Sequence, residues 1–515
     1  MYSDQCDLCQ KPIVSLFSPD KPFQVYCQEC WWSDKWDPIK YGREFDFSRP
    51  FFEQFQEFQK SVPRLSIFNL NSTNSEYTNH SSSNKNCYMG LGFADDEDCM
   101  YGHWLMHSKD CLDMLYCEHC EECYECIYCR NCNNTFFSQY CQNVRDSLIC
   151  FECKSCENCI GCVQLQHKKY HILNKEVSKD EFEKTKNEIL SSPKKFQEML
   201  ELSVKLKQTV PHRYSFQLNC QNCVGDDLYD SKNSYFCFNC REIEDCKYMY
   251  DLGSNKDSMD CYEHGWLVPS ELNYEAHAGM AGYHLLFCNI CADSRDLIYC
   301  DLCFNNSRNN FGCVGLKKKE YCILNKQYTK EGYEELVPKI IEHMKKTGEW
   351  GEFFPSSMSL FGYNETAAQE YFSLTKNEAI KNGFKWQDED FSMKYDGPFY
   401  EPKDILEYLN NEQERQNLLS GILKCSVSGK PFKITHVELA FYIKHGIPIP
   451  TKHYDIRHQE RLKLRNPRKL YHRECMCVES NHGHEGKCRV KFETTYAPER
   501  TEKVYCEKCY QQSII

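Results

Sequence analysis

The spacing of the cysteines restricts the folds open to this chain more than any other feature. Of 37 cysteines, fifteen lie between residues 87 and 162 and twelve between 220 and 322. From Cys87 to Cys123 the main interval is twelve residues, and from Cys123 to Cys159 it is nine. Within these intervals cysteine also recurs at every third position. A helix, with 3.6 residues per turn, does not produce this pattern, and neither does a simple strand, with a period of two.

A narrow β-solenoid fits this rhythm. Each coil of nine or twelve residues would have short straight sides and a corner every few residues. Residues one coil apart would then stack at about 4.7–4.9 Å, the spacing of hydrogen-bonded strands. Only small side chains such as Cys and Ser fit so thin an interior. Because each coil buries little surface, such coils depend on their neighbours for stability.

The stretch that carries this rhythm occurs twice. Lys85-Asn86-Cys87-Tyr88 corresponds to Lys232-Asn233-Ser234-Tyr235, and the closing run Tyr170–Lys175 corresponds to Tyr321–Lys326. The sequence therefore predicts an internal duplication of about 150 residues.

The duplication also tests whether the solenoid thiols bind metal. Five cysteines of the first copy, from Cys120 to Cys132, align with Ser, Asn, Ala, Gly and Gly of the second copy. A metal ion at those positions is therefore not required for the coil to form. At those positions a role as small side chains that fill the interior is at least as well supported as a role as metal ligands. The cysteines present in both copies are the better metal ligands: Cys141, Cys150, Cys153, Cys162, Cys291, Cys300, Cys303 and Cys313.

Helical signals follow each copy. Ser178 and Glu181 form a capping box, and Thr329 can cap a helix with an apolar stripe from Tyr333 to Met344, in which Pro338 predicts a kink or a restart. The fold class predicted is mainly β: two tandem Cys-rich β-solenoid-like repeats with capping helices, flanked by N- and C-terminal zinc-ribbon modules. The predicted domains are a zinc ribbon and linker (1–60), a first solenoid (61–175), a helical cap (176–209), a second solenoid (210–327), a helical cap and linker (328–420) and a basic zinc module (421–515).

Two further sets of cysteines have the spacing of zinc ligands. Cys6-x2-Cys9 and Cys27-x2-Cys30 can place four thiolates tetrahedrally around Zn²⁺ at about 2.3 Å, and such a closed shell stabilises rather than catalyses. Near the C-terminus the predicted ligands are Cys477, Cys488, Cys506 and Cys509, with Cys475, His482 or His484 as substitutes.

The charge of the chain is uneven. The net charge is −13, yet residues 424–474 hold twelve Lys and Arg against four acids. Such a segment can hold phosphates, so nucleic acid or a nucleoprotein is one expected partner, and another protein is a second. The alternatives are a solvated face or a dock for the acidic solenoids of the same chain. The candidate contacts are Arg457, Arg461, Lys463, Arg465, Arg468 and Lys469.

Composition and missing motifs narrow the class of protein. With a mean hydropathy of −0.68 the chain has no run long enough to span a bilayer, and its first residues carry no apolar leader. We therefore expect a cytoplasmic protein with reduced thiols and no membrane contact. No GxxxxGK[ST], GxSxG or HExxH motif is present.

Several segments resemble a group of uncharacterised Cys-rich zinc-ribbon proteins of candidate-phyla bacteria. The resemblance rests on the Cys6–Cys30 ribbon with Trp36-Asp37-Pro38, on Phe45–Phe52, and on the repeated coils and closures. Residues Gly429–Pro450 look like a treble-clef zinc ribbon, whose pattern implies a hybrid site with Cys425 and His453, Ser428 standing where a second cysteine is expected. The group carries no established activity, so the resemblance implies architecture alone.

Three functions remain open. The first is a non-enzymatic zinc-binding scaffold that docks partners, since solenoids present long repetitive surfaces. The second is a thiol-rich metal-storage or redox protein. The third is a metalloenzyme, which would require an open metal site that the sequence does not identify.

Overall fold

The computed structural model describes residues 1–93, 95–102, 112–113, 136–190, 192–265, 268–389, 391 and 394–514. Helix and strand each account for 26% of the residues that the structure describes. The fold is a mixture of α and β with many sheets, so the predicted predominance of β structure is not confirmed, and no closed solenoid is found among the described residues. No helix in the described ranges is both long and apolar enough to cross a bilayer. The predicted coil positions Cys111, Cys117, Cys120, Cys123, Cys126, Cys129 and Cys132 lie outside the described residues.

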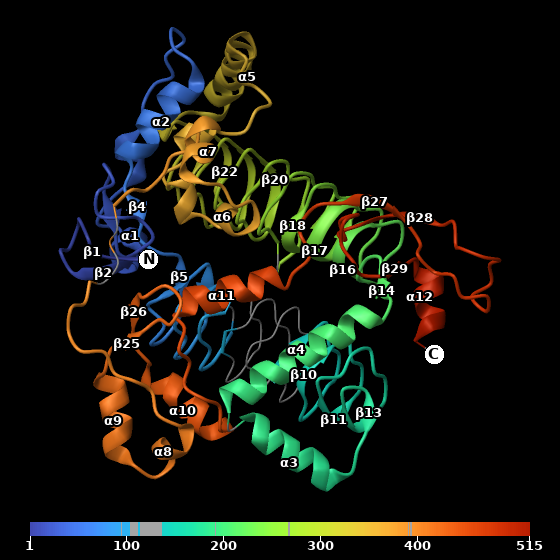
Figure 1. Cartoon of the computed structure of the whole chain (residues 1–515). Coiled ribbons are helices and arrows are strands. Elements are labelled where there is room, and N and C mark those ends of the chain that lie inside the picture. The colour runs from blue at the N-terminus through green and yellow to red at the C-terminus, as the bar shows by residue number, and fades with distance from the viewer. Residues whose placement is uncertain are drawn as a thin grey trace.

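Short parallel strands pile up in two stacks (Figure 1). The first stack comprises β5 (Asn69–Leu70), β6 (Thr78–Asn79), β7 (Ser81–Ser82), β8 (Gly90–Leu91), β9 (Phe136–Gln139), β10 (Leu148–Phe151), β11 (Glu157–Ile160), β12 (Lys169–Ile172) and β13 (Lys175–Glu176). The second stack is one ten-stranded sheet of β15 (Gln217–Leu218), β16 (Val224–Tyr229), β17 (Tyr235–Glu244), β18 (Tyr250–Lys256), β19 (Ser270–Glu271), β20 (Gly282–Leu286), β21 (Ser294–Ile298), β22 (Arg308–Phe311), β23 (Glu320–Ile323) and β24 (Lys326–Gln327). In both, the pairing is parallel until the last pair, which is antiparallel.

Neighbouring strands of a stack are usually twelve residues apart in the sequence. Cys150 pairs with Ser138, and Cys240 pairs with Leu252. Positive φ angles recur at every third residue through most of the stacks, for example at Asn239, Glu242 and Asp245. A corner every three residues explains why the sequence shows a period of three inside a period of twelve.

The predicted nine-residue coil is wrong. Where cysteines recur every nine residues, Leu148 still pairs with Ile160, twelve residues on. The nine-residue interval instead separates a side chain from the backbone carbonyl that it contacts in the neighbouring layer of the stack. The Cys150 thiol, for example, donates to the carbonyl of Cys159, with a sulfur–oxygen distance of 3.6 Å. The interval is thus a hydrogen-bonding step, not a coil length.

Helices lie before and after each stack. They are α2 (Phe51–Ser61) and α3 (Lys179–Leu190) around the first, and α4 (Pro193–Thr209) and α5 (Lys330–Thr347) around the second. Thr329 caps α5 by accepting from Gly332 N–H, and this helix continues through Pro338 without the predicted restart. Phe51 of α2 packs on Tyr299 and Phe311 of the second stack, whereas α4 contacts β10 of the first. The helix that precedes one stack therefore covers the other.

Two small modules of similar design lie at the chain ends. The N-terminal module consists of β1 (Tyr2–Gln5), β2 (Pro12–Ser15), β3 (Val25–Tyr26) and α1 (Gln28–Trp32). The C-terminal module consists of β27 (Tyr471–Glu474), β28 (Lys491–Thr494), β29 (Val504–Tyr505) and α12 (Glu507–Ser513). Each is an antiparallel hairpin followed by a short strand and a helix. Strand β3 pairs with β4 (Arg64–Leu65), which leads into the first stack, and β29 pairs with β14 (His212–Arg213), which leads into the second.

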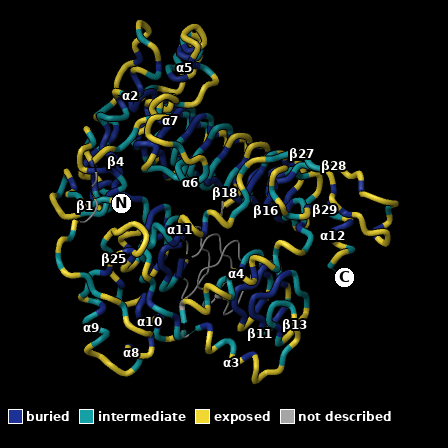
Figure 2. Tube along the Cα trace, viewed as in Figure 1, coloured by how far each residue is buried: buried dark blue, intermediate teal, exposed yellow. Residues whose placement is uncertain are grey.

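The remaining helices and strands bridge the stacks. They are the 3₁₀ helices η1 (Pro38–Tyr41), η2 (Ser356–Met358) and η3 (Tyr363–Glu365), helices α6 (Ala368–Tyr371), α7 (Lys376–Lys381), α8 (Ile405–Leu409), α9 (Glu412–Ser420), α10 (His436–His445) and α11 (Tyr454–Lys463), and the hairpin β25 (Leu423–Lys424) and β26 (Pro431–Phe432). Helix α10 shares a core with the first stack, where Phe441 and Ile447 join Met100 and Leu148. Figure 2 shows buried residues along both stacks and exposed ones on the outer helices.

Candidate metal centres

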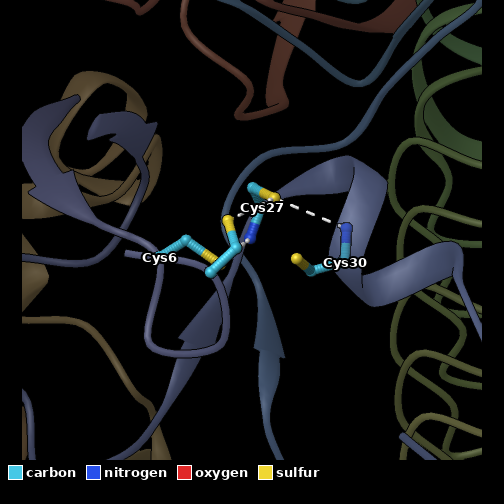
Figure 3. Close-up of side chains that lie close together, drawn as sticks. Cys6, Cys27 and Cys30 are labelled. Carbon is cyan, nitrogen blue, oxygen red and sulfur yellow. Dashed lines mark hydrogen bonds between the residues drawn. The ribbon is translucent and has the colours of Figure 1, made fainter. Parts of the chain in front are cut away.

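The four cysteines of the N-terminal module come together. The sulfur atoms of Cys6, Cys9, Cys27 and Cys30 all lie within 4.8 Å of one another. Cys6 and Cys9 belong to the turn between β1 and β2, and Cys27 and Cys30 to the start of α1. Figure 3 shows Cys6, Cys27 and Cys30 facing one another across this space. Four thiolates so placed can hold a metal ion.

Backbone N–H groups favour ionisation of these thiols. Cys27 N–H donates to Cys6 Sγ at 3.2 Å, and Cys30 N–H donates to Cys27 Sγ at 3.4 Å. Burial opposes ionisation of Cys6, but hydrogen bonds from the backbone of Cys27, Cys9 and Leu8 outweigh it and lower the pKa of this thiol to about 7. Hydrogen bonds to the thiolate therefore prepare the ligand that a metal needs.

The C-terminal module brings together Cys475, Cys488, Cys506 and Cys509, again within 4.8 Å. Cys506 N–H donates to Cys475 Sγ at 3.2 Å, as Cys27 N–H does to Cys6. Burial opposes ionisation of Cys488, yet the hydrogen bond from the Val490 backbone, with others, lowers the pKa of this thiol. The two modules thus present the same donor set in the same local geometry.

Cys477 is not a member of that group of four, which corrects the predicted set. Cys475 directly follows β27, as Cys6 follows β1, so the hairpin carries its sulfur toward Cys506. Cys477 lies two residues further on, beside His482 Nδ1 at 3.1 Å, and groups with His484 and Cys509. From the sequence, Cys475 was predicted only as a possible replacement for one of the four ligands.

A sequence signal for Cys475 was available. Val25-Tyr26-Cys27-x2-Cys30 matches Val504-Tyr505-Cys506-x2-Cys509, and at the same offset Cys9 matches Cys488 and Phe17-Ser-Pro-Asp-Lys21 matches Tyr496-Ala-Pro-Glu-Arg500. The knuckle between Cys475 and Cys488 is ten residues longer than that between Cys6 and Cys9, and the insertion contains Cys477, His482 and His484. Tyr2-x3-Cys6 also matches Tyr471-x3-Cys475, so aligning the residues just before each first knuckle would have placed Cys475 opposite Cys6.

A third knuckle keeps the backbone of a metal site without its ligands. Cys425 N–H donates to Lys430 O at 2.9 Å and Gly429 N–H donates to Cys425 O at 3.0 Å, as in the Cys6–Lys11 turn. Ser428 holds the place of the second cysteine, and no metal-ligand group in the described ranges includes Cys425 or His453. The hybrid site implied by the family resemblance is therefore not assembled.

The stack cysteines do not gather into ligand groups. This applies to Cys141, Cys150, Cys153, Cys162, Cys291, Cys300, Cys303 and Cys313, none of which belongs to a metal-ligand group found among the described residues. Their thiols point at carbonyl oxygens: Cys303 Sγ donates to Asp301 O and Cys313 O, both at 3.7 Å. Burial raises the pKa of Cys303 and Cys240 well above that of a free thiol. These residues fill the interior of the stacks, and the cysteines of the described ranges form no disulfides.

The predicted basic patch is divided. Arg457 and Arg461 are buried and pair with Asp113, at 3.0 and 3.3 Å, and Arg457 also lies 3.7 Å from Glu438. Arg468 pairs with Asp251 of the second stack, and Arg465 lies over the Tyr371 ring at 4.4 Å. Of the six candidates only Lys463 and Lys469 are exposed. Three arginines of this segment, Arg457, Arg461 and Arg468, therefore form ion pairs with acidic residues of the same chain.

Comparison with models of known protein families, with curated proteins and with solved structures finds no match. The assignment of function rests on the geometry of the chain itself.

Proposed function

We propose that this chain is a non-enzymatic zinc-binding scaffold, in which two β-solenoids are joined into one rigid body by two tetrathiolate zinc modules. The carrying observation is that both groups of four thiols sit at the same structural position. In each module the strand just before the second cysteine pair, Cys27-x2-Cys30 or Cys506-x2-Cys509, pairs with the strand that leads into a stack. Zinc fits the all-thiolate donor set, and a closed four-sulfur shell leaves no position for substrate.

Contacts at the far side of each module support the proposal. The N-terminal module begins the first stack but also touches the end of the second, where Lys317 Nζ donates to Trp31 O at 2.6 Å. The C-terminal module pairs through β29 with β14, the strand that leads into the second stack. It also contacts the first stack, where Tyr510 Oη donates to Glu152 at 2.7 Å. A metal in either module would therefore fix a junction between the two stacks.

The buried thiols argue against a metal-storage or redox function. A store needs thiolates that exchange metal with solution, whereas Cys303 and Cys313 are buried, neutral and hydrogen-bonded to carbonyls. Nucleic-acid docking through residues 457–469 is not part of the proposal, because Arg457, Arg461 and Arg468 are used in ion pairs within the chain.

Elemental analysis of the reduced, purified protein tests the proposal. We expect about two zinc ions per chain that resist gel filtration, as closed tetrathiolate sites do. The variant Cys150→Ser is the matched control, since Ser147 already occupies an equivalent interior position and donates to Arg145 O at 2.7 Å. It should keep both metals. A content of many labile metals, or a loss of metal in Cys150→Ser, would favour the storage function instead.

A further inference from the structure

A cavity of about 1250 Å³ lies between the two stacks, the N-terminal module and the segment 353–391. Pockets for small ligands are commonly about 300–1,000 Å³, mostly apolar, with a few convergent polar groups. Four side chains of the second stack line its wall, Tyr250, Tyr262, Glu263 and His277, and Tyr371 of α6 and Arg468 line it beside them.

The stack repeats a tyrosine–acid pair on this wall. Tyr250 forms a parallel bridge with Tyr262 one coil on, so Tyr250-Asp251 and Tyr262-Glu263 are equivalent positions of successive coils. Asp251 and Glu263 both have positive φ, at 52° and 53°. The backbone therefore presents the two acids in the same way.

The first pair already binds a cation from the chain itself. The Arg468 guanidinium contacts both carboxylate oxygens of Asp251, lies 5.7 Å from the Tyr250 ring centre and covers the Tyr371 ring at 3.5 Å. A carboxylate below and aromatic faces beside a guanidinium are a favourable cation site.

The second pair, Tyr262 and Glu263, has the same aromatic ring and carboxylate but, within the described ranges, no arginine in contact with them. Glu263 is 8% exposed, and no Lys or Arg in the described part of the chain forms an ion pair with it. Other buried acids are better supplied: Arg64 pairs with Asp301 at 2.6 Å, and Glu349 accepts from two backbone N–H groups. Burial, reinforced by the charges of Asp251 and Glu370, raises the pKa of Glu263 to about 8. A hydrogen bond from Tyr262 and the charge of Arg468 act on this pKa in the opposite direction.

His277 does not supply the missing charge. Asn289 Nδ2 donates to Asp301 at 2.9 Å, so Asn289 Oδ1 is the acceptor that faces His277 Nδ1 at 2.7 Å. The Nδ1 atom therefore carries the proton, and the lone pair of Nε2 lies 3.9 Å from Glu263 Oε2. Burial lowers the pKa of His277, which keeps the ring neutral. Both groups can accept hydrogen bonds from one donor-rich cation.

We propose that the cavity binds a small organic cation, of the guanidinium or alkylammonium class, through Glu263 and His277 Nε2 with the Tyr262 ring alongside. The bound cation repeats, one coil further on, the place that Arg468 takes on Asp251. Its charge draws the proton off Glu263, so that one proton leaves to the buffer for each cation bound.

Isothermal titration calorimetry with the full-length protein tests this assignment. The probes are methylguanidinium, methylammonium and methylurea, the last being a neutral shape analogue of the first. We expect at least one of the two cations to bind, and methylurea to bind at least about tenfold more weakly, since buried charge-assisted hydrogen bonds are strong. The tighter cation distinguishes the guanidinium from the ammonium class. Equal binding of methylurea, or no binding of either cation, would overturn the proposal.

Glu263→Gln should lose at least about tenfold in affinity for the cation. Glu275→Gln is the matched control, because Glu275 is a half-buried glutamate of the same stack that does not line the cavity. Titrations at pH 6.5 in two buffers of different ionisation enthalpy should show release of close to one proton by the wild type and none by Glu263→Gln. Unchanged affinity in Glu263→Gln would refute the site.

Arg468→Ala supplies a second, independent measurement. Removing the guanidinium vacates the Tyr250–Asp251 pair, so the number of bound ions of the tighter-binding cation should rise from one to two. A stoichiometry that stays at one would overturn the equivalence of the two pairs on which the proposal rests.

Discussion

At the scale of single residues, position within the hairpin decides which thiol joins the group of four that could hold a metal ion. Cys475 and Cys477 are both buried and only two residues apart, but only Cys475 belongs to the four-sulfur group with Cys506. The choice follows from the β27 strand, which ends at Glu474 and places the next residue where the N-terminal module has Cys6.

We expect Cys475→Ser to lose about one of two bound metals, because three thiolates no longer close a tetrahedral shell. Cys477→Ser should keep both. Mass spectrometry under native conditions counts the metals directly. Loss of metal in Cys477→Ser with retention in Cys475→Ser would reverse the assignment and return the site to the set first predicted from the sequence.

Glu263 also gives a pH dependence whose sign can be worked out. Its pKa is about 8 in the folded chain, above the value of about 4.3 for an unperturbed glutamate, so between these values the folded state holds a proton that the unfolded state has lost. Raising the pH through this window therefore lowers the free energy of unfolding, by up to about 1.4 kcal/mol per unit.

Glu263→Gln should remove this loss and so gain stability relative to the wild type at pH 7.5 more than at pH 5. Urea unfolding followed by circular dichroism at the two pH values measures the difference. Glu157→Gln, an exposed site on the first stack, should leave the wild-type pH dependence unchanged. If Glu263→Gln kept the wild-type slope, the carboxyl would be ionised in the fold.

At the scale of strands and helices, local patterns in the sequence predicted those structural features, such as strand spacing and helix caps, that depend on residues close together in the chain. The twelve-residue step and the Thr329 cap of α5 both rest on nearby residues and were found. The nine-residue coil was wrong because a hydrogen bond between adjacent coils, such as Cys150 to Cys159, leaves the same periodic trace as a coil. Pro338 was predicted to kink or restart the helix, yet α5 runs without interruption from Lys330 to Thr347, with Val337 and Ile340 packed in the core.

Long-range pairings were beyond a single sequence. Nothing local in His212–Arg213 indicates that β14 pairs with β29, nearly three hundred residues away. The destination of Arg457 and Arg461 was likewise open, because a basic run that binds phosphate and one that pairs with Asp113 look the same in a sequence.

The two module junctions can be separated by hydrogen exchange. In Cys506→Ser/Cys509→Ser we expect amide exchange in β14 to rise by roughly tenfold or more, because metal loss frees β29 from its partner strand. Exchange in β4 should not change. The matched variant Cys27→Ser/Cys30→Ser should show the reverse, with β4 exposed and β14 protected. Equal exposure of both strands in either variant would mean that the modules do not hold separate junctions.

At the scale of the whole molecule, the parts follow one another in a closed circuit. The N-terminal module leads into the first stack, which meets the C-terminal module at Glu152 and Tyr510. Strand β29 of that module pairs with β14, which leads into the second stack, and the last part of this stack contacts Trp31 through Lys317 (Figure 1). The equivalences extend to the junctions. Arg64 pairs with Asp301 at one, and at the other His212 and Phe151, their counterparts in the duplicated sequence, lie with ring centres 5.9 Å apart. The molecule is thus built as two copies of module, helix and stack, each closing on the other.

A closed circuit predicts how metal removal changes the shape. A compact chain of this length has a radius of gyration of roughly 24 Å. A thiol-competing zinc chelator should raise the value measured by small-angle X-ray scattering, because both junctions loosen while each stack keeps its own hydrogen bonds. Far-ultraviolet circular dichroism should therefore change little. The same chelator preloaded with zinc is the control and should leave the radius unchanged. If the radius stayed constant as metal was lost, the buried ion pairs of Arg457, Arg461 and Arg64 would be sufficient to hold the circuit shut. If instead the circular dichroism collapsed with the metal, the stacks would depend on the modules for folding rather than for assembly.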